Sequence, residues 1–385
     1  MSVRRLAGIP GFSIDRVAAA AGDDPDILRL ENLDTDLRPP SAAIAATQVA
    51  LTDDNANSYL PFTGSLPLRE RVAQHLKSQT GHPYCPEEVV ITAGGTEGLF
   101  DALLATTDPG DEVILTDPTY AGMIYRVRLA GAVPKLVPFV TINNEWRLDL
   151  EALRSMVSDR TRVVFIMNPS MPSGAVLNQE EWRALTTLCQ QRSLWLLYNA
   201  AMERILYDGR LLIHPAGFSG MPERTIIVGS VSKEYRMIGW RIGWVVGPAS
   251  LMSDIARVHI YNVVTPTGIS QVAASAALQS PPEDLAACVA EWQRRRDTVL
   301  EQLRDFPVIP AAGGWSMLFN VGAWGYGSFH ASQLLLERGK VAATPMRDWG
   351  EKNSDQFVRL VFSNEPVERL ASLRDRVVQS LKKPS

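Results

Sequence analysis

One lysine stands out by its chemical neighbours. Lys233 closes the run Ser230-Val231-Ser232-Lys233, and Arg241 follows between Gly239 and Gly243. An amine placed between two apolar strands is partly desolvated, which favours the neutral form that makes Schiff bases. The Arg241 guanidinium could hold a phosphate through two parallel hydrogen bonds, and the hydroxyls of Ser230 and Ser232 add donors. The alternative interpretation is a surface turn with a structural arginine.

A second candidate for anion binding is the run Gly94-Gly95-Thr96. It follows an apolar stretch at 89–93 that reads as a strand, and it precedes a helical pattern at 97–104. Backbone N–H groups and the helix dipole favour an anion at such a junction. The motif alone is a weak signal, and its placement strengthens it.

Short apolar runs, interpreted as buried strands, precede these candidate residues and are expected to position them. They are unbroken rather than alternating, and they fall at 89–93, 112–116, 163–167, 194–198, 225–229 and 242–246. Strands buried on both faces have this pattern, so we predict an α/β fold with a mostly parallel central sheet flanked by helices. In such sheets ligands bind beyond the carboxyl ends of the strands, where both candidate motifs lie.

The sequence also predicts how the chain divides into domains. We expect an N-terminal arm at 1–45, a large α/β domain at 46–280 and a small α+β domain at 281–385. The small domain should contain a helix at 283–304, strands at 316–320 and 356–362, and a final helix at 366–381. The basic run Arg294-Arg295-Arg296 is interpreted as a solvated helix face.

Composition excludes several function classes. A net charge of -4 without a basic patch argues against nucleic acid as a partner. The three cysteines, Cys85, Cys189 and Cys288, are far apart, so we expect neither a disulfide framework nor a metal site. No apolar run is long enough to span a membrane, and we expect a cytoplasmic protein.

The lysine segment resembles the cofactor-lysine signature of the class I/II aminotransferases. Other segments resemble further motifs of this family in the same order, so the resemblance covers nearly the whole chain. The resemblance implies the aspartate-aminotransferase fold (fold type I), pyridoxal 5'-phosphate (PLP) as cofactor, a Schiff base at Lys233 and a homodimer. In Tyr59–Arg69, Tyr59 is similar to the residue that reaches the phosphate of the neighbouring subunit.

Further residues receive roles from the same resemblance. Gly94, Gly95 and Thr96 are similar to the phosphate loop, together with Ser230, Ser232 and Arg241. Tyr120 follows Asp117-Pro118-Thr119 and is expected to stack on the pyridine ring. Arg359 sits where the family binds the substrate α-carboxylate. A structural acidic partner for Arg359 is the alternative, since a buried arginine needs one.

The sequence departs from the family on one edge of the pyridine ring. Asn168-Pro169-Ser170-Met171 carries Met171 where the family has a second Asn that bonds the 3'-oxygen. Asn199 replaces the Asp that pairs with the protonated ring nitrogen, and Met202 replaces a Tyr. A hydrogen bond to a charged group contributes about 1.5–3 kcal/mol. Each ~1.4 kcal/mol is about tenfold in rate, so ordinary transamination should slow roughly ten- to a hundredfold.

Three interpretations of these departures stay open. The first is an aminotransferase, slow or narrow in specificity, that acts on an α-amino acid with a 2-oxo acid as acceptor. The second is a PLP enzyme that eliminates, cyclises or oxidises an amino acid. The third is a PLP-binding protein without turnover.

The segment at 30–40 also departs from the family's glycine-rich turn. It is acidic, with Glu31, Asp34 and Asp36. These carboxylates could meet a cationic, arginine-like substrate; a solvated loop before Pro39 is the alternative.

Overall fold

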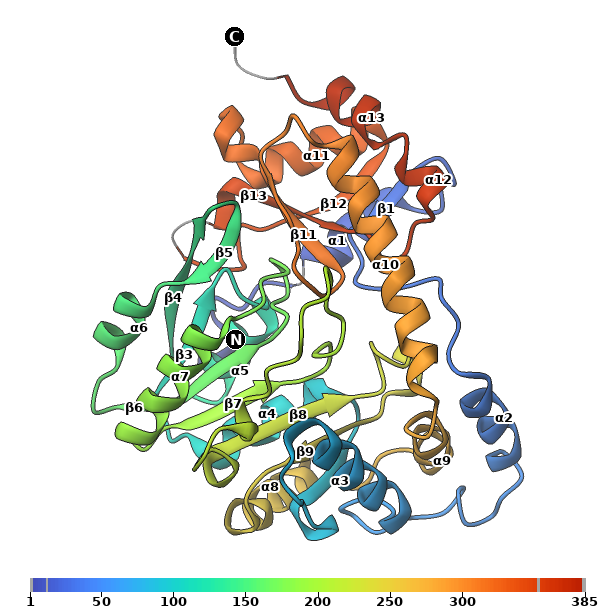
Figure 1. Ribbon diagram of the computed structural model, residues 1–385, viewed down its shortest axis with the longest axis vertical. Coiled ribbons are helices and arrows are strands. Elements are labelled where there is room, and N and C mark those ends of the chain that lie inside the picture. Colours follow the sequence, from blue (N-terminus) through green and yellow to red (C-terminus); the bar gives the residue numbers. More distant parts are fainter. Residues whose placement is uncertain (1–2, 12, 352–353, 383–385) are drawn as a thin grey trace.

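The computed structural model describes residues 3–11, 13–351 and 354–382, and it contains two sheets (Figure 1). The larger sheet has the order β2-β9-β8-β7-β6-β3-β4-β5. Its strands are β2 (Val89–Thr92), β3 (Glu112–Asp117), β4 (Val133–Ile142), β5 (Glu145–Leu148), β6 (Thr161–Met167), β7 (Trp195–Asn199), β8 (Thr225–Ser230) and β9 (Gly243–Val246).

The predicted mostly parallel sheet is confirmed. β8, β7, β6, β3 and β4 pair in parallel. β9 runs antiparallel to both of its neighbours, β2 and β8, and the edge strand β5 runs antiparallel to β4. Every residue of β2, β3, β8 and β9 is buried, which explains the unbroken apolar runs.

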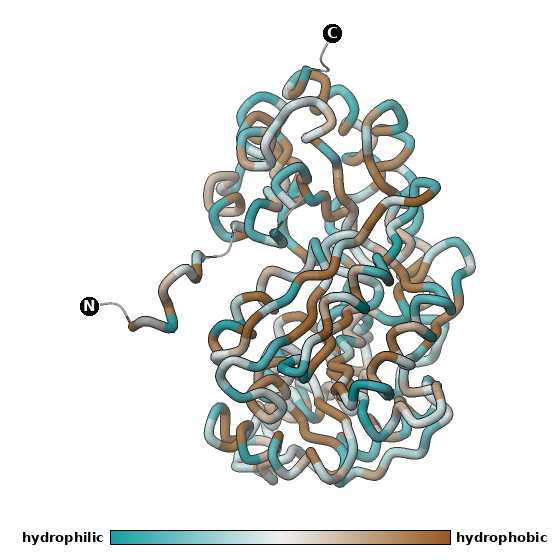
Figure 2. Tube along the Cα trace, turned by 90° about the vertical axis from the view of Figure 1, so that its left-hand side faces the viewer, coloured by the Kyte–Doolittle hydropathy of each residue, from teal (hydrophilic) through white to brown (hydrophobic). Residues whose placement is uncertain are grey.

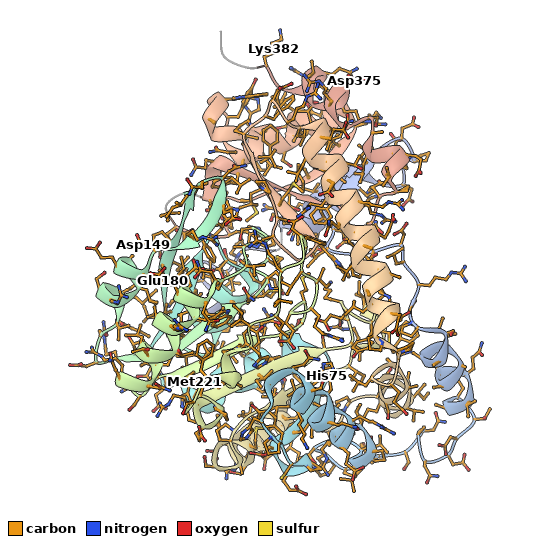
Figure 3. The ribbon with its side chains drawn as sticks, in the orientation of Figure 1. His75, Asp149, Glu180, Met221, Asp375 and Lys382 are labelled. Atoms are coloured by element: carbon orange, nitrogen blue, oxygen red, sulfur yellow. The ribbon has the colours of Figure 1, made fainter. Side chains whose placement is uncertain are left out.

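Helices surround the larger sheet in Figure 1. They are α2 (Ser41–Ala50), α3 (Leu66–Thr80), α4 (Gly95–Thr106), α5 (Ala121–Leu129), α6 (Leu150–Met156), α7 (Gln179–Gln191), α8 (Ala249–Asn262) and α9 (Gly268–Ala277). Local caps fix where some begin. Asp149 accepts hydrogen bonds from the backbone N–H groups of Glu151 and Ala152 at the start of α6 (Figure 3). Asn178 and Glu181 form a reciprocal capping box on α7.

The smaller sheet has the order β1-β12-β13-β11-β10. Its strands are β1 (Leu28–Leu30), β10 (Val308–Ile309), β11 (Ser316–Asn320), β12 (Val341–Pro345) and β13 (Phe357–Val361), with helices α1 (Ser13–Ala21), α10 (Pro282–Gln302) and α11 (Ser328–Gly339). β1 pairs in parallel with β12, so the N-terminal part of the chain joins this sheet. The division of the chain at residues 45 and 280 stays a prediction.

The single C-terminal helix expected at 366–381 is wrong. The chain forms α12 (Val367–Leu370) and α13 (Leu373–Ser380), separated by Ala371 and Ser372. The Ser372 hydroxyl donates to the backbone carbonyl of Arg369 at 2.8 Å and accepts from Arg376 Nε at 2.9 Å. A serine that bonds local backbone in this way competes with helix continuation.

The solvated face expected at 294–296 is also wrong for two of its three arginines. Arg295 is 3% exposed and Arg296 5% exposed. Arg295 bonds both carboxylate oxygens of Asp36 at 2.7 and 3.1 Å, and Arg296 bonds Asp208 at 2.7 Å. Bidentate partners from distant segments make these arginines internal anchors of α10.

Apolar stretches thread the middle of the molecule in Figure 2, where the strands of the larger sheet lie. One core cluster extends through both sheets. Among the described residues, no helix is both long and apolar enough to cross a bilayer.

Candidate active site

A cavity of about 350 Å³ lies where carboxyl ends of the large-sheet strands meet β13 of the small sheet. Its lining includes most of the predicted site residues: Gly95, Thr96, Tyr120, Met171, Asn199, Ser230, Ser232, Lys233, Arg241 and Arg359. Residues far apart in the sequence therefore share one wall, as the strand-end argument predicted.

Lys233 is partly buried in the loop after β8. Its Nζ donates to the backbone carbonyl of Leu33 at 2.7 Å and lies 5.0 Å from the centre of the Trp315 ring. Burial lowers the pKa of Lys233 to about 8, with help from the positive charges of Arg359 and Arg241. A fraction of the amine is therefore neutral near pH 7, as a nucleophile or base requires.

The anion end of the cavity lies at the start of α4. Gly94 precedes this helix with φ +80, and a Cβ there would lie 2.4 Å from Arg241 Nη2. Glycine thus lets the guanidinium reach the helix N-terminus. Arg241 also donates from Nη1 to the Ile238 carbonyl at 2.9 Å and to Ser232 Oγ at 3.4 Å. A helix N-terminus beside a guanidinium favours a phosphate.

Arg359 is fully buried in β13. Its Nη2 donates to the Glu31 carbonyl and, at 3.2 Å, to Thr344 Oγ1; its Nη1 lies 3.4 Å from Met171 Sδ. The Trp349 ring centre lies 4.8 Å from the guanidinium carbon. Within the described ranges, no carboxylate bonds Arg359, so the structure does not supply the alternative acidic partner.

One nitrogen of the Arg359 guanidinium makes no hydrogen bond within the described part of the chain. This nitrogen, Nε, is buried. Burial also holds the pKa of Arg359 below its usual range. A bound carboxylate would give Nε a hydrogen-bond acceptor, and its negative charge would stabilise the protonated guanidinium.

Four predicted residues, Gly94, Asn168, Met202 and Tyr59, do not line the cavity, although Gly94 directly precedes α4 beside Arg241. Asn168 is 2% exposed and its Oδ1 accepts from the Leu177 backbone at 2.8 Å. Met202 is 1% exposed and packs in the core. Tyr59 is 82% exposed, so it contributes nothing to the cavity of its own chain. Met171 and Asn199 are the departures that face the cavity.

Sequence reasoning missed other residues of the site. Ile14 and Asp15 of α1 line the cavity, as do Asn32 and Leu33. Trp349 covers Arg359. Nothing local marks α1 as part of the site, since only its packing brings it there.

Two of the three acidic side chains at 30–40 have arginine partners, whereas Asp34 lies close enough to Lys233 for its charge to oppose the lowering of the Lys233 pKa. Asp36 is bound to Arg295, and the Glu31 carboxylate accepts from Arg29 Nε at 2.8 Å. Of this segment, Asn32 and Leu33 line the cavity. The carboxylate found on the cavity wall is Asp15 instead.

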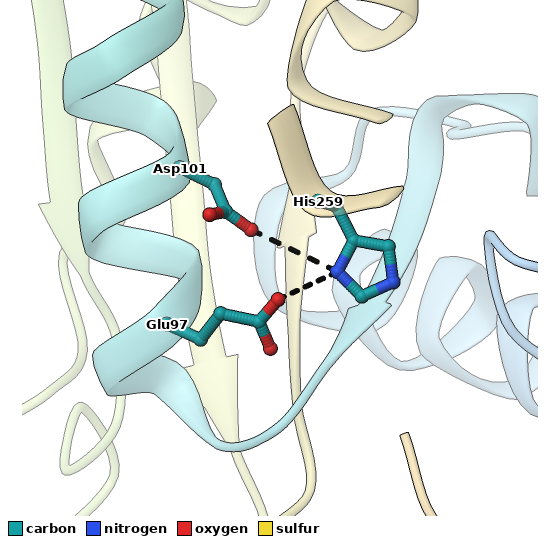
Figure 4. Close-up of side chains that lie close together, drawn as sticks. All are labelled: Glu97, Asp101 and His259. Carbon is teal, nitrogen blue, oxygen red and sulfur yellow. Dashed lines mark hydrogen bonds and ion pairs between the residues drawn. The ribbon is translucent and has the colours of Figure 1, made fainter. Parts of the chain in front are cut away.

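A buried charged cluster stands behind the anion end (Figure 4). His259 Nδ1 lies 2.6 Å from Glu97 Oε1 and 3.8 Å from Asp101 Oδ2, while Nε2 donates to the Phe62 carbonyl at 2.9 Å. Glu97 also accepts from the Ala93 backbone, just before the phosphate loop. Burial alone would lower the pKa of His259, but the two carboxylates outweigh it and raise the pKa to about 9. The cluster therefore holds a proton at neutral pH.

Comparison with known proteins agrees with this geometry. The family "Aminotransferase class I and II" matches residues 27–377. An arginine–pyruvate transaminase of Pseudomonas aeruginosa is 30% identical over 372 residues, which is 94% of each chain. A probable N-succinyldiaminopimelate aminotransferase of Mycobacterium tuberculosis is 32% identical, over 88% of this chain and 90% of that one.

Solved structures show the same fold. The N-succinyldiaminopimelate aminotransferase of Mycobacterium tuberculosis superimposes with a TM-score of 0.92 at 30% identity, covering 98% of this chain and 100% of that one. An aspartate aminotransferase of Thermus thermophilus with maleate gives 0.90 at 28% identity, over 99% and 100%. The chain belongs to the class I and II aminotransferases. It is thus a fold type I enzyme that transfers amino groups and uses PLP as its cofactor.

The residues present fit that cofactor. The cavity has an anion end at Arg241 and α4, an amine of lowered pKa at Lys233, and an aromatic ring at Tyr120. The Arg126 guanidinium carbon lies over the Tyr120 ring, 5.4 Å from its centre.

Proposed function

We propose that this aminotransferase uses Lys233 both to hold the cofactor aldehyde and to move the Cα proton of an α-amino acid. The observation that carries the proposal is the sharing of one cavity by Lys233, Arg241 and Arg359. When bound, PLP supplies an aldehyde for the amino group and a ring that accepts the electron pair left at Cα. Single-turnover measurements with an amino acid and a 2-oxo acid test the proposal.

Lys233 acts as the base in this scheme. An amine with a pKa of about 8 is a good proton acceptor near neutral pH and a sufficient donor afterwards. The Leu33 carbonyl, 2.7 Å from Nζ, orients the amine while it is free. Replacing Lys233 with Ala should remove both functions.

Arg359 orients the substrate. Its buried guanidinium has an unpartnered Nε among the described residues, and a carboxylate could bind the guanidinium by paired hydrogen bonds. Fixing the carboxylate there limits where Cα can lie relative to Lys233, which lowers the entropic part of the barrier.

For the substrate side chain we favour a positive charge. Asp15 lines the same cavity as Arg359, and one relative at 30% identity is an arginine–pyruvate transaminase. A panel of arginine, lysine, aspartate and glutamate tests this, with the Asp15→Asn variant expected to lose its preference for the cationic pair. Activity on the dicarboxylic amino acids alone would contradict it.

A homodimer completes the proposal. The Tyr59 side chain is exposed and, by the family resemblance, reaches the partner's phosphate site. Exposed Phe62, Leu66 and Tyr261 supply further apolar surface. Burial of these exposed side chains would favour association of two chains.

A second candidate is PLP chemistry other than transamination, such as elimination, cyclisation or oxidation of an amino acid. The observation in its favour is the cavity wall itself, which offers Asn199 and Met171 where the family pattern has an acid and an amide. Release of ammonia or consumption of oxygen without a matching amino-acid product would select this candidate.

A further inference from the structure

The orientation of the Asn199 side chain is fixed by its own loop. Its Oδ1 accepts a hydrogen bond from the backbone N–H of Ala201 at 3.1 Å. A backbone N–H only donates, so the amide nitrogen of Asn199 cannot occupy that position without placing two donors face to face. Nδ2 is therefore the atom turned away from the loop. Among the described residues, none accepts a hydrogen bond from Nδ2.

This amide lies at the sheet side of the cavity. Asn199 is the last residue of β7 and pairs in register with Met167, the last residue of β6. Both line the cavity, as does Met171, and Asn199 is only 6% exposed. This part of the wall therefore offers an amide donor between thioethers.

Acidic groups are absent from the sheet side of the wall, within the ranges described. Asp15 lines the cavity from α1 and is exposed. Glu203 follows Asn199 in the chain but is buried off the wall, where burial and nearby Glu234 raise its pKa to about 8. Neither supplies a negative charge beside Asn199.

The remaining step rests on the proposed function. On the pyridine ring of PLP, the carbon bearing the aldehyde neighbours the carbon bearing the phosphate arm, and the ring nitrogen is opposite the former. With the aldehyde held at Lys233 and the phosphate at Arg241, the nitrogen would lie at the end of the ring away from Lys233, and Asn199 is the amide on the sheet side of the cavity wall. We propose that Asn199 donates a hydrogen bond from Nδ2 to this nitrogen and thereby holds it unprotonated.

The physical reason is the matching of donors and acceptors. A protonated ring nitrogen is a donor and would face the Nδ2 donor, whereas an unprotonated nitrogen presents a lone pair to it. A buried donor opposed by another donor loses its hydrogen bond and its solvation together. Without a carboxylate to attract the ring proton, the neutral form is favoured.

The test is the ¹⁵N NMR shift of PLP labelled at the ring nitrogen and bound to the full-length protein, recorded from pH 6 to 8.5. The proposal predicts the shift of an unprotonated pyridine at every pH. In Asn199→Asp the Ala201 N–H keeps its acceptor, and the shift should move to that of a pyridinium. Asn199→Ala removes the donor without adding charge, and its shift should titrate with pH.

The outcomes are separable. A pyridinium shift in the natural protein overturns the role of Asn199 while leaving cofactor binding, and hence the proposed function, intact. Identical shifts in the natural protein and Asn199→Ala across this pH range would also overturn it. Failure of labelled PLP to bind, seen as a free-cofactor signal, would contradict the proposed function and this inference with it.

Discussion

Lys233 Nζ donates to the carbonyl oxygen of Leu33 at 2.7 Å, so the N-terminal segment contacts the amine that we propose as the catalytic base. The same segment holds Arg359 through the carbonyl of Glu31. Backbone carbonyls of the segment that follows β1 therefore accept hydrogen bonds from both Lys233 and Arg359. Capture of a cofactor aldehyde requires Lys233 to leave Leu33 and to lose its proton.

The rate of PLP capture by the cofactor-free protein should therefore rise through pH 8 and level off by about pH 9. The neutral fraction of an amine with a pKa of about 8 grows roughly tenfold between pH 7 and 9. Stopped-flow absorbance measures this rate. A simple alkyl amine, whose pKa is about 10.4, is the control and should continue to rise above pH 9. A protein profile that follows the control would contradict the lowered pKa.

Arg359→Lys should raise KM for the amino acid, with a loss in kcat/KM on the order of ten- to a hundredfold. A lysine keeps the charge but not the paired hydrogen bonds, each contributing about 1.5–3 kcal/mol to a charged group. Steady-state kinetics measure the loss. Arg295→Lys is the matched control, since Arg295 is equally buried but bonds Asp36 outside the cavity. Equal KM changes in both variants would mean that Arg359 acts through stability alone.

How much of this site was predictable depends on the range of the interactions. Lys233 was predictable from its own segment, because it follows a buried strand whose apolar run is visible in the sequence. Tyr120, after β3, and Asn199, the last residue of β7, lie at strand ends as expected, but their roles came from the family resemblance. Parallel strands then bring their carboxyl ends together. Arg359 required the family resemblance, since an arginine inside an apolar strand shows only that a partner exists.

The residues that sequence reasoning missed are set by long-range packing. Asp15 reaches the cavity because α1 packs near β12, and Trp349 bonds Ser13 Oγ at 3.2 Å. From its own segment Arg295 is predicted to be exposed, because its partner Asp36 comes from the other end of the chain. Such pairings carry no local periodicity, so no pattern within a single segment predicts them.

His259→Gln should lower the free energy of unfolding by about 1–3 kcal/mol at neutral pH, because buried carboxylates lose their donor. In the folded protein the pKa of His259 is about 9, against an ordinary 6.5. A group with a raised folded pKa stabilises fully below pH 6.5 and loses that contribution as pH rises through 9. Burial also raises the pKa of Glu97, which acts in the same direction.

Chemical denaturation between pH 6 and 10 measures this dependence. The natural protein should lose stability across the interval, and His259→Gln should lose less. His330→Gln, at an exposed histidine, is the control and should follow the natural protein. An unchanged slope in His259→Gln would show that His259 does not hold the proton.

In the proposed dimer, Tyr59→Phe should weaken PLP binding about tenfold without changing the oligomeric state, because it would remove one hydroxyl donor to the partner's phosphate site. Light scattering gives the oligomeric state and titration of absorbance gives the affinity. Tyr326→Phe, whose hydroxyl contacts the Lys382 backbone instead, is the control. A monomer with full activity would contradict the shared site.

The most direct test of the central claim is the visible absorption of the purified protein with PLP, before and after an amino acid is added. The account predicts an absorption band that is absent in Lys233→Ala, and conversion of this band by an amino acid with release of the matching 2-oxo acid. A band that persists in Lys233→Ala would remove Lys233 from its role. A band that amino acids never convert, with ammonia released instead, would contradict transamination.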